Sequence, residues 1–306
     1  MKVIRDLTLA DLEQDTVLTI GAFDGLHLGH QELIARLTKS AMESKRLSGV
    51  VTFDPLPRSL FARDNTPFVC LTTIDDKVEL LQSWGVDLLV IVPFTWEVAN
   101  TSARDFVQPL CDRLRMVELW VGWNFALGRG REGDVGHLQR LGAEMGFTLH
   151  VVEPVSDGSA VVSSTQIRSL LNAGRIREAS EMLGRLYRLR GMVTPGSSEE
   201  QRTGVATARV QLLDACTVPA SGVYALYLTA SGRAHRAVGN IGFAPAGSAS
   251  VSGVDVHLLD PSENLEGETV RLQFVERVRD ERRFASVDAL KRQIRRDIAR
   301  AEEILQ

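Results

Sequence analysis

Two histidines three residues apart stand directly after a glycine-containing turn, in the segment TIGAFDGLHLGHQELI at residues 19–34. Gly21 and Gly25 let the backbone approach a ligand closely. The helix that follows offers unpaired N–H groups and the positive end of its dipole to an anion. His27 and His30 can face the same side of its first turn, where imidazole donates hydrogen bonds to phosphate oxygens. The segment therefore predicts a phosphate site with two histidine donors.

Each piece of this segment has a simpler explanation when it is taken alone. Single glycines are usually turn residues, and histidines near a helix start are commonly surface residues. A zinc site is another alternative for His27 and His30, but no third Cys or His lies nearby in the sequence. The conjunction of a glycine turn, a helix start and a histidine pair favours phosphate binding.

A second group of hydroxyl and cationic residues occurs in VSSTQIR at residues 162–168. Ser163, Ser164 and Thr165 fall at the start of a predicted helix, and Arg168 follows one turn later. Hydroxyls and free N–H groups gather there, as a phosphate site requires, but serines and threonines before a helix are also ordinary caps. From the residues alone, both interpretations are open.

The elements around these segments alternate between short apolar runs and amphipathic stretches. Helical stretches at 76–84 and 136–145 end at Gly85 and Gly146, where a left-handed cap is expected. Strand, helix, strand repetition predicts a parallel sheet covered on both faces, and two short helices at 165–173 and 176–183 close the domain. The predicted strands are 16–20, 49–53, 87–92, 117–122 and 147–152.

The pattern changes after about Tyr187, where a polar loop, TPGSSEEQRTG, precedes a series of short alternating runs. Their spacing is typical of an antiparallel barrel or sandwich. From Ser286 onward apolar residues recur at helical spacing, which predicts an amphipathic helix with Ser286 as its N-cap. The alternating runs are 205–212, 223–229, 234–241, 254–259 and 269–274.

Composition describes an ordinary globular protein of about two domains, with 306 residues, 44% hydrophobic and 24% charged. The formal net charge of −4 gives no basic field for nucleic acid, and the strongest apolar stretch, 88–92, is too short to span a bilayer. Cys70, Cys111 and Cys216 are an odd, widely spaced set, and no signal core opens the chain. We expect a cytoplasmic protein; the oligomeric state is open.

Ordered motifs along nearly the whole chain resemble the bacterial bifunctional riboflavin kinase/FAD synthetase family. GAFDGLHLGH is similar to the GxFDGxHxGH signature of the nucleotidyltransferase superfamily, and VSSTQIR is similar to the family's ISSTxIR motif. TFDPLPR at 52–58 and VGWNFALGRGREG at 121–133 resemble two further family segments. The resemblance implies a Rossmann-like α/β nucleotidyltransferase domain at 1–185. At 186–306 it implies a small six-stranded antiparallel β-barrel domain with a C-terminal helix.

The resemblance also implies an activity, the transfer of AMP from ATP to FMN with release of pyrophosphate, which makes FAD. His27, His30 and Arg168 would then be catalytic, and Ser163, Ser164 and Thr165 would hold the β- and γ-phosphates. Mg²⁺ would bridge phosphate oxygens of ATP, with no protein ligand assigned. Further ATP contacts would come from Gly21, Phe23, Asp24 and Gly25. Asn124 would contact the flavin or nucleotide, as would Asp54 and Arg58 unless these two belong to an exposed loop.

The carboxy-terminal half departs from the family at the kinase site. Where the family has GFPTAN, this chain has GVATAR at 204–209, so Thr207 remains but Arg209 takes the place of the Mg²⁺-binding asparagine. Asp255 stands where the family has a general-base glutamate, and its carboxylate is one methylene shorter. These changes predict weak or lost riboflavin kinase activity. Further departures are Gln201, Ala206 and Ala246.

Two alternatives to this function remain. The chain could be a fully bifunctional riboflavin kinase/FAD synthetase, or a flavin-binding regulatory or carrier protein that has kept the barrel for binding. Other nucleotidyltransferases share the first signature and transfer to nicotinamide mononucleotide or pantetheine phosphate. Only the later motifs and the barrel point to flavin.

Overall fold

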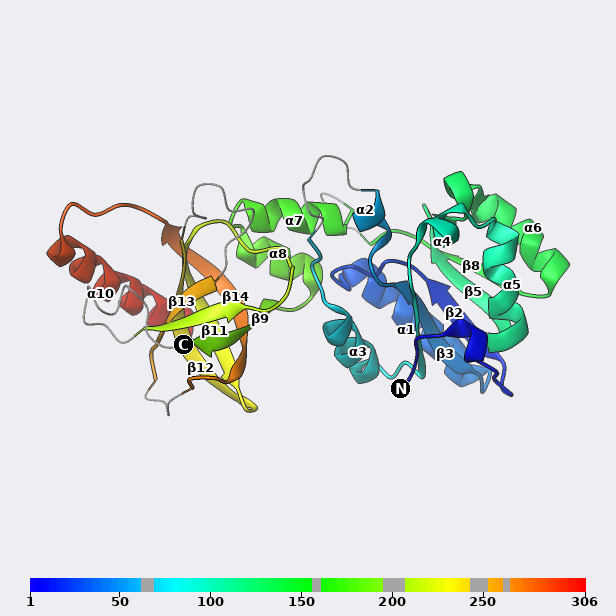
Figure 1. Cartoon of the computed structure of the whole chain (residues 1–306), viewed down its shortest axis with the longest axis horizontal. Helices are drawn as coiled ribbons and strands as arrows, with labels where there is room; N and C mark the ends of the chain where they lie inside the picture. Colours follow the sequence, from blue (N-terminus) through cyan, green and yellow to red (C-terminus); the bar gives the residue numbers. More distant parts are fainter. Residues whose placement is uncertain (62–68, 156–160, 195–206, 243–252, 261–264) are drawn as a thin grey trace. The chain divides into compact units, whose positions relative to one another are not determined.

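The structure is a computed structural model, and it describes residues 1–61, 69–155, 161–194, 207–242, 253–260 and 265–306. The chain forms two compact units, Met1–Ser163 and Ser164–Gln306. Figure 1 draws the first unit in blue to green and the second in green to red. Each unit is described by itself.

A parallel sheet of six strands forms the centre of the first unit (Figure 1). Its central strands are apolar on both faces: Val50 and Leu89 face one layer of helices, and Val51 and Val90 face the other. A parallel sheet buried on both sides requires this pattern. The strand order is β1 (Lys2–Ile4), β4 (Leu88–Val92), β3 (Leu47–Phe53), β2 (Thr16–Ile20), β5 (Met116–Gly122) and β8 (Thr148–Val152).

Helices cover both faces of this sheet. On one face α1 (Leu28–Glu43) and α3 (Ile74–Ser83) bury Leu33, Ile34 and Leu81. On the other face α5 (Ala103–Leu114) and α6 (Val135–Met145) bury apolar residues against the sheet. The remaining elements are short: α2 (Pro57–Leu60), α4 (Trp96–Asn100), the hairpin β6 (Ala126–Leu127) and β7 (Gly133–Asp134), and 3-10 turns at Leu7–Leu9 and Arg129–Arg131.

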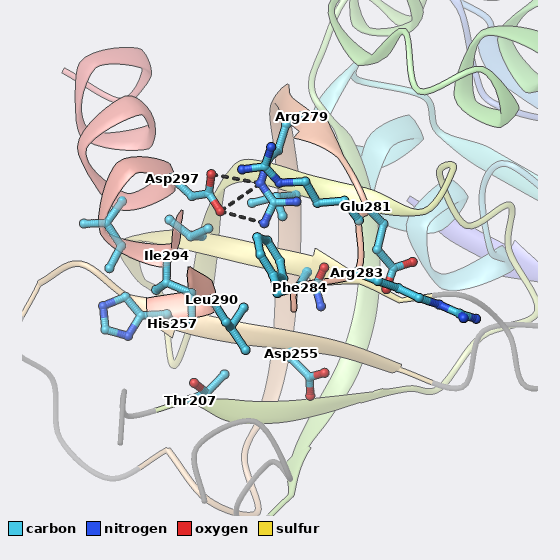
Figure 2. A pocket seen from close by; sticks show the side chains of 15 residues that line it. Thr207, Asp255, His257, Arg279, Glu281, Arg283, Phe284, Leu290, Ile294 and Asp297 are labelled. Carbon is cyan, nitrogen blue, oxygen red and sulfur yellow. Dashed lines mark hydrogen bonds and ion pairs between the residues drawn. The ribbon is translucent and has the colours of Figure 1, made fainter. Parts of the chain in front are cut away.

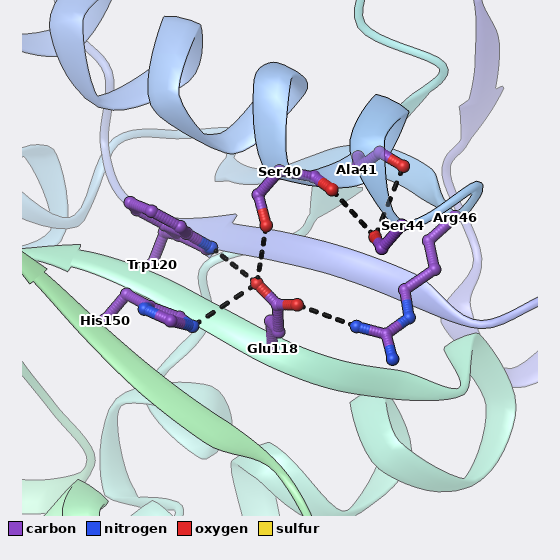
Figure 3. A network of polar contacts seen from close by, with 7 residues as sticks. All are labelled: Ser40, Ala41, Ser44, Arg46, Glu118, Trp120 and His150. Carbon is purple, nitrogen blue, oxygen red and sulfur yellow. Dashed lines mark hydrogen bonds and ion pairs between the residues drawn. The ribbon is translucent and has the colours of Figure 1, made fainter.

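A polar network connects α1 to the face of the sheet that this helix covers (Figure 3). Glu118 of β5 accepts hydrogen bonds from Ser40 Oγ at 2.9 Å and Trp120 Nε1 at 3.1 Å, and it pairs with Arg46 at 2.7 Å. His150 Nε2 lies 3.3 Å from the same carboxylate, and its ring stacks on that of Trp120. Because Ser40 is near the carboxyl end of α1, these contacts fix the direction of the helix whose other end carries the histidine pair.

A closed antiparallel barrel forms the core of the second unit. Its interior holds Tyr224, Leu226 and Phe274, all fully buried. The order around the barrel is β10 (Ala208–Leu212), β13 (Gly253–Leu258), β12 (Arg233–Ile241), β11 (Gly222–Ala230), β14 (Thr269–Asp280) and β9 (Tyr187–Thr194).

Three helices pack outside the barrel. The long helix α10 (Val287–Ile304) begins at Ser286, whose hydroxyl accepts from Ala289 N at 3.2 Å, and it buries Ala301 against the outer face of β11. The short helices α7 (Ser164–Asn172) and α8 (Ile176–Leu183) belong to this unit, where α8 lies against β9 and β14. The sequence analysis counted both short helices with the first domain.

The predicted fold class is confirmed: a Rossmann-like α/β domain is followed by a six-stranded barrel and a C-terminal helix. Gly85 and Gly146 have the expected left-handed conformation at the ends of α3 and α6. Strands β1 and β9 were not predicted. In β9 the arginines at 188 and 190 alternate with buried Tyr187 and Leu189, so the strand has no continuous apolar run. Within the described residues, no helix is both long and apolar enough to cross a membrane.

Candidate active sites

The predicted histidine pair lies just past the carboxyl end of β2. His27 is the N-cap position of α1, His30 lies in its first turn, and the two rings stack with their centroids 3.7 Å apart. The carboxyl edge of a parallel sheet is where open α/β folds bind ligands. The two imidazoles therefore stand side by side at the positive end of a 16-residue helix.

The backbone before α1 follows a tight left-handed path. Gly25 has φ 85°, and Phe23 and Leu26 have φ 45° and 43°, values that side-chain-bearing residues rarely adopt. The buried ring of Phe23 meets that of His30 edge to face at 5.1 Å. A Cβ at Gly21 would lie 3.1 Å from the Phe23 ring. Gly21 and Phe23 thus shape the turn that supports His30.

Buried polar residues form hydrogen bonds that stabilise this turn. Lys77 of α3 is 1% exposed, and its ammonium donates to the carbonyl of Ala22 at 2.7 Å. Thr52 donates to the same carbonyl at 3.2 Å. Asp24 is also buried, and one of its carboxylate oxygens accepts from Leu71 N at 2.8 Å. Sequence reasoning missed Lys77, since its place in an amphipathic helix resembles that of any surface lysine.

Exposed aromatic rings gather at the same edge of the sheet, after β3 and β4. Phe61 and Trp96 are 54% and 58% exposed, and their rings meet edge to face at 5.5 Å. Phe94 lies 6.2 Å from Phe61 and 5.3 Å from Phe53. Large exposed aromatics in contact are unusual on a protein surface and mark binding sites. The sequence analysis did not single out these residues, although each follows the end of a strand.

The other predicted contacts of the first unit lie on loops at this edge. Asp54 and Arg58 are exposed after β3, and Arg58 belongs to α2. Asn124 is exposed after β5, and its carbonyl accepts from Arg131 at 3.2 Å. All three follow the carboxyl ends of strands, as a ligand-lining position would.

The hydroxyl-rich segment begins a helix, as predicted. Ser164 and Thr165 open α7, Ser163 precedes it, and the guanidinium of Arg168 donates to the carbonyl of Ser164 at 3.3 Å. Because α7 and α1 belong to different compact units, the convergence of the two helix starts on one triphosphate stays a prediction.

A pocket of about 390 Å³ lies between the outer face of the barrel and α10 (Figure 2). Its apolar wall includes Val223 of β11, Val238 of β12 and Leu290 and Ile294 of α10, while Thr207 and Asp255 contribute polar groups. A slot with one apolar wall and a few polar groups suits a flat amphipathic ligand.

An ion pair fastens α10 to one side of this pocket. Asp297 is 4% exposed and accepts three hydrogen bonds from the guanidinium of Arg279, at 2.8 to 3.0 Å. Gln293 donates to the same carboxylate at 2.7 Å. Figure 2 shows the pair above Phe284, whose ring lies 5.6 Å from the Arg279 guanidinium carbon.

The two unusual residues of the kinase-like site contact each other directly. Arg209 of β10 and Asp255 of β13 are cross-strand partners, and Arg209 Nη1 donates to both carboxylate oxygens at 3.0 and 2.9 Å. A guanidinium thus occupies the place beside Asp255 where the family resemblance implies Mg²⁺, so these side chains do not fit a metal ion. Across the described residues, no three His, Cys, Asp or Glu side chains gather as a ligand set. Gln201, Ala206 and Ala246 lie outside the described residues.

Comparison with known families agrees with both units. A model described as FAD synthetase matches residues 9–166, and one described as riboflavin kinase matches residues 183–305. A protein from Pseudomonas fluorescens named bifunctional riboflavin kinase/FMN adenylyltransferase is 36% identical over 99% of this chain and 98% of its own length. The chain belongs to the bifunctional riboflavin kinase/FMN adenylyltransferase family.

Further relatives extend this family assignment. The proteins of the same name from Escherichia coli K12 and Bacillus subtilis 168 are 36% and 29% identical, over 99% and 92% of this chain and 97% and 90% of their own lengths. A crystal structure described as a macrolide-efflux protein from Streptococcus pneumoniae is 27% identical, with a TM-score of 0.90 and 98% of each chain covered. The family fold therefore extends over the whole chain.

The comparisons bear on the predicted loss of kinase activity. Both family models match, and the curated relatives carry both activities in their names. The expectation of weak or lost riboflavin kinase activity has no support in these findings. They favour the alternative, a bifunctional riboflavin kinase/FAD synthetase.

Proposed function

We propose that this chain converts riboflavin to FAD in two steps, with FMN as the intermediate. The barrel transfers a phosphoryl group from ATP to riboflavin, and the parallel-sheet domain transfers AMP from a second ATP to FMN. The observation that supports the second step best is the stacked histidine pair at the amino end of α1. Family membership along the whole chain supports both steps.

In adenylyl transfer, a phosphate oxygen of FMN attacks the α-phosphorus of ATP in line. A bond from this oxygen to phosphorus forms, the bond to the bridging oxygen breaks, and pyrophosphate leaves with the electron pair. Catalysis of this kind is positioning and charge stabilisation. ATP enters as its Mg²⁺ complex, and the ion offsets charge on the phosphate oxygens.

The histidine pair and the helix terminus would stabilise charge on the α-phosphoryl group. Donors fixed in place before the reaction cost no reorganisation when charge develops. The rings of His27 and His30, which stack on each other while His30 also contacts the Phe23 ring, meet this requirement. Ser163, Ser164, Thr165 and Arg168 would hold the departing pyrophosphate, which requires that the start of α7 reach the start of α1 during the reaction.

The exposed rings of Phe61 and Trp96 would bind the isoalloxazine ring of FMN. A flat aromatic ligand gains most by stacking on exposed aromatic faces, and these two lie beside the loops that carry Asp54, Arg58 and Asn124. Gly21, Asp24 and Gly25 would contribute backbone and loop geometry at the ATP site. The reaction would take place in the cytoplasm, where ATP and FMN are supplied.

The pocket between the barrel and α10 would bind riboflavin. Its apolar wall suits the ring system, and Thr207 and Asp255 lie on the polar side where a riboflavin hydroxyl would react. Phosphoryl transfer to that hydroxyl forms an oxygen–phosphorus bond, releases ADP and frees the hydroxyl proton.

The test feeds the protein ATP, Mg²⁺ and either riboflavin or FMN as the only flavin, and follows the flavins by chromatography. Riboflavin should give FMN and then FAD. Asp255→Asn should slow the first step and leave the conversion of supplied FMN intact, while His30→Ala should stop at FMN. Formation of FAD from FMN without FMN formation from riboflavin would reject the kinase step. Absence of FAD from either flavin would reject the whole proposal.

A further inference from the structure

Arg209 engages Asp255 with only part of its guanidinium. Both oxygens of Asp255 accept from the same nitrogen, Nη1, at 3.0 and 2.9 Å. Within the described chain, Nε and Nη2 of Arg209 have no hydrogen-bond acceptor, and the side chain is 38% exposed. Nε and Nη2 form one edge of the planar guanidinium fork, which matches two oxygens of a phosphate group.

The neighbouring backbone leaves room for this arrangement. Gly253 lies two residues before Asp255 on β13, and a Cβ there would stand 2.8 Å from Arg209 Nε. The guanidinium therefore lies over a strand position that has no side chain. This packing and the pair with Asp255 fix Arg209 without using its Nε and Nη2 donors.

The same contact removes Asp255 as a metal ligand. A divalent cation binds a carboxylate through its oxygen lone pairs and is repelled by a positive charge beside it. Here both oxygens already face a guanidinium, 2.9 and 3.0 Å away. A divalent ion at this carboxylate would have to displace Arg209.

We propose that Arg209 replaces a protein-held divalent cation in the barrel and binds the phosphate chain of a nucleotide directly, through Nε and Nη2. This inference rests on the proposed kinase function of the barrel. Asp255, the partner of Arg209, lines the pocket together with Thr207. Figure 2 shows both residues on the side of the pocket away from the Arg279–Asp297 pair. The barrel then binds a nucleoside diphosphate without a metal ion.

The experiment uses the full chain with histidine rings isotopically labelled, and reads the NMR signal of His257, which lines the pocket. His257→Gln identifies that signal, and the signal of buried His235 serves as the internal reference. ADP is added with EDTA or with Mg²⁺. A shift of His257 reports binding at the barrel alone, although nucleotides also bind elsewhere on the chain.

In the unsubstituted protein, ADP should shift the His257 signal both in EDTA and in Mg²⁺. The two dissociation constants for ADP should agree within about threefold, which is a difference in binding free energy below 1 kcal/mol. In Arg209→Asn the dissociation constant in EDTA should rise at least about tenfold. Arg209→Lys should also bind more weakly, since an ammonium lacks the fork. The matched control is Arg236→Asn, which breaks the half-exposed pair with Asp260 on the same barrel and should leave both dissociation constants unchanged.

A second measurement uses Mn²⁺ without nucleotide. Its paramagnetism should broaden the His257 signal selectively in Arg209→Asn, where Asp255 is released, and not in the unsubstituted protein. Selective broadening in the unsubstituted protein, or ADP binding there that requires Mg²⁺, would overturn the inference.

Adding riboflavin and following the same His257 signal distinguishes a failure of this inference from a failure of the proposed function. If riboflavin shifts His257 and ADP does so only with Mg²⁺, the kinase proposal stands and the role of Arg209 is wrong. If neither riboflavin nor ADP shifts His257 under any condition, both are wrong.

Discussion

At the scale of single residues, the stacked pair of His27 and His30 is the most specific feature of the first unit. Two imidazoles with centroids 3.7 Å apart at a helix terminus repel each other when both are charged, so a bound phosphate anion is the natural complement. The sequence predicted that the two side chains can face the same side of the first turn, because residues three apart at a helix start share a face.

Replacing one of these donors should slow the chemical step. In His30→Ala we expect the rate of FAD formation at saturating FMN and ATP to fall by about 10²- to 10³-fold, the effect of removing one donor from a developing anion. Quenched-flow sampling of a single turnover measures it. FMN affinity, followed by flavin fluorescence, should change little. A single-turnover rate equal to that of the unsubstituted protein would exclude His30 from catalysis.

Removing an exposed ring should affect binding more than chemistry. In Trp96→Ala we expect the KM for FMN to rise by about tenfold, the loss of about 1.4 kcal/mol, with kcat changed less than KM. Trp123→Ala, which removes another half-exposed ring, serves as the control. Equal KM values for Trp96→Ala and the unsubstituted enzyme would show that the flavin stacks elsewhere.

Tyr224 makes the stability of the barrel sensitive to alkaline pH. Burial raises the pKa of Tyr224 to about 12, although the charge of Arg277 opposes the shift. The unfolded chain loses this proton near pH 10, so the stabilisation by neutral Tyr224 is present below that pH and is lost as pH rises towards 12. A pKa difference of about two units between the folded and unfolded chain corresponds to about 2 to 3 kcal/mol of unfolding free energy.

Urea unfolding between pH 9 and about 12 should show this loss in the unsubstituted protein and a smaller one in Tyr224→Phe. Tyr224→Phe also loses the hydrogen bond to the carbonyl of Ala220, but that cost does not depend on pH. Parallel pH profiles for the two proteins would contradict the assigned pKa.

At the scale of elements, a buried lysine connects α3 to the turn before α1. Lys77→Met keeps most of the side-chain volume but removes the donor to the Ala22 carbonyl. We expect a loss of about 1 to 3 kcal/mol in the unfolding free energy, and slower FAD formation because the turn loses its support. Lys39→Met, at an exposed position of α1, is the control and should leave both quantities unchanged. If Lys77→Met changed neither the unfolding free energy nor the rate of FAD formation, Thr52 alone would be enough to stabilise the turn.

The Arg279–Asp297 pair makes a second prediction at this scale. Asp297→Asn leaves the partly buried guanidinium of Arg279 without its counter-charge, which should destabilise the barrel unit by about 3 kcal/mol and loosen α10. Riboflavin affinity should fall as well, because α10 forms one wall of the pocket. Glu303→Gln breaks an exposed pair on the same helix and should cost less than about 1 kcal/mol. Equal stability of the two variants would contradict this role.

The elements were predictable where burial dominates the pattern. The strands of the parallel sheet are apolar on both faces and stand out as short runs, and the glycine caps mark the ends of α3 and α6. β9 was missed because its outward arginines break up the apolar run. The support from Lys77 and the aromatic contacts of Phe61 and Trp96 depend on segments that meet only in the folded chain.

At the scale of the whole molecule, both halves retain the family fold, while the barrel carries an Arg209–Asp255 ion pair where the resemblance implies a metal ion. The departures at Arg209 and Asp255 were visible in the sequence, but their contact was not, because it depends on the register of β10 against β13. Taken separately, the two substitutions favoured the prediction of weak or lost riboflavin kinase activity. As an ion pair in which Nε and Nη2 of Arg209 do not contact Asp255, they are consistent with a kinase site that binds phosphate through arginine instead of a metal ion.

The most direct test of the account supplies FMN and ATP labelled at the α-phosphorus, then follows the label and the pyrophosphate. The account predicts that the label enters FAD and that one pyrophosphate appears for each FAD formed. Label released as free AMP with FMN unchanged, or FAD formed without an equal amount of pyrophosphate, would contradict it.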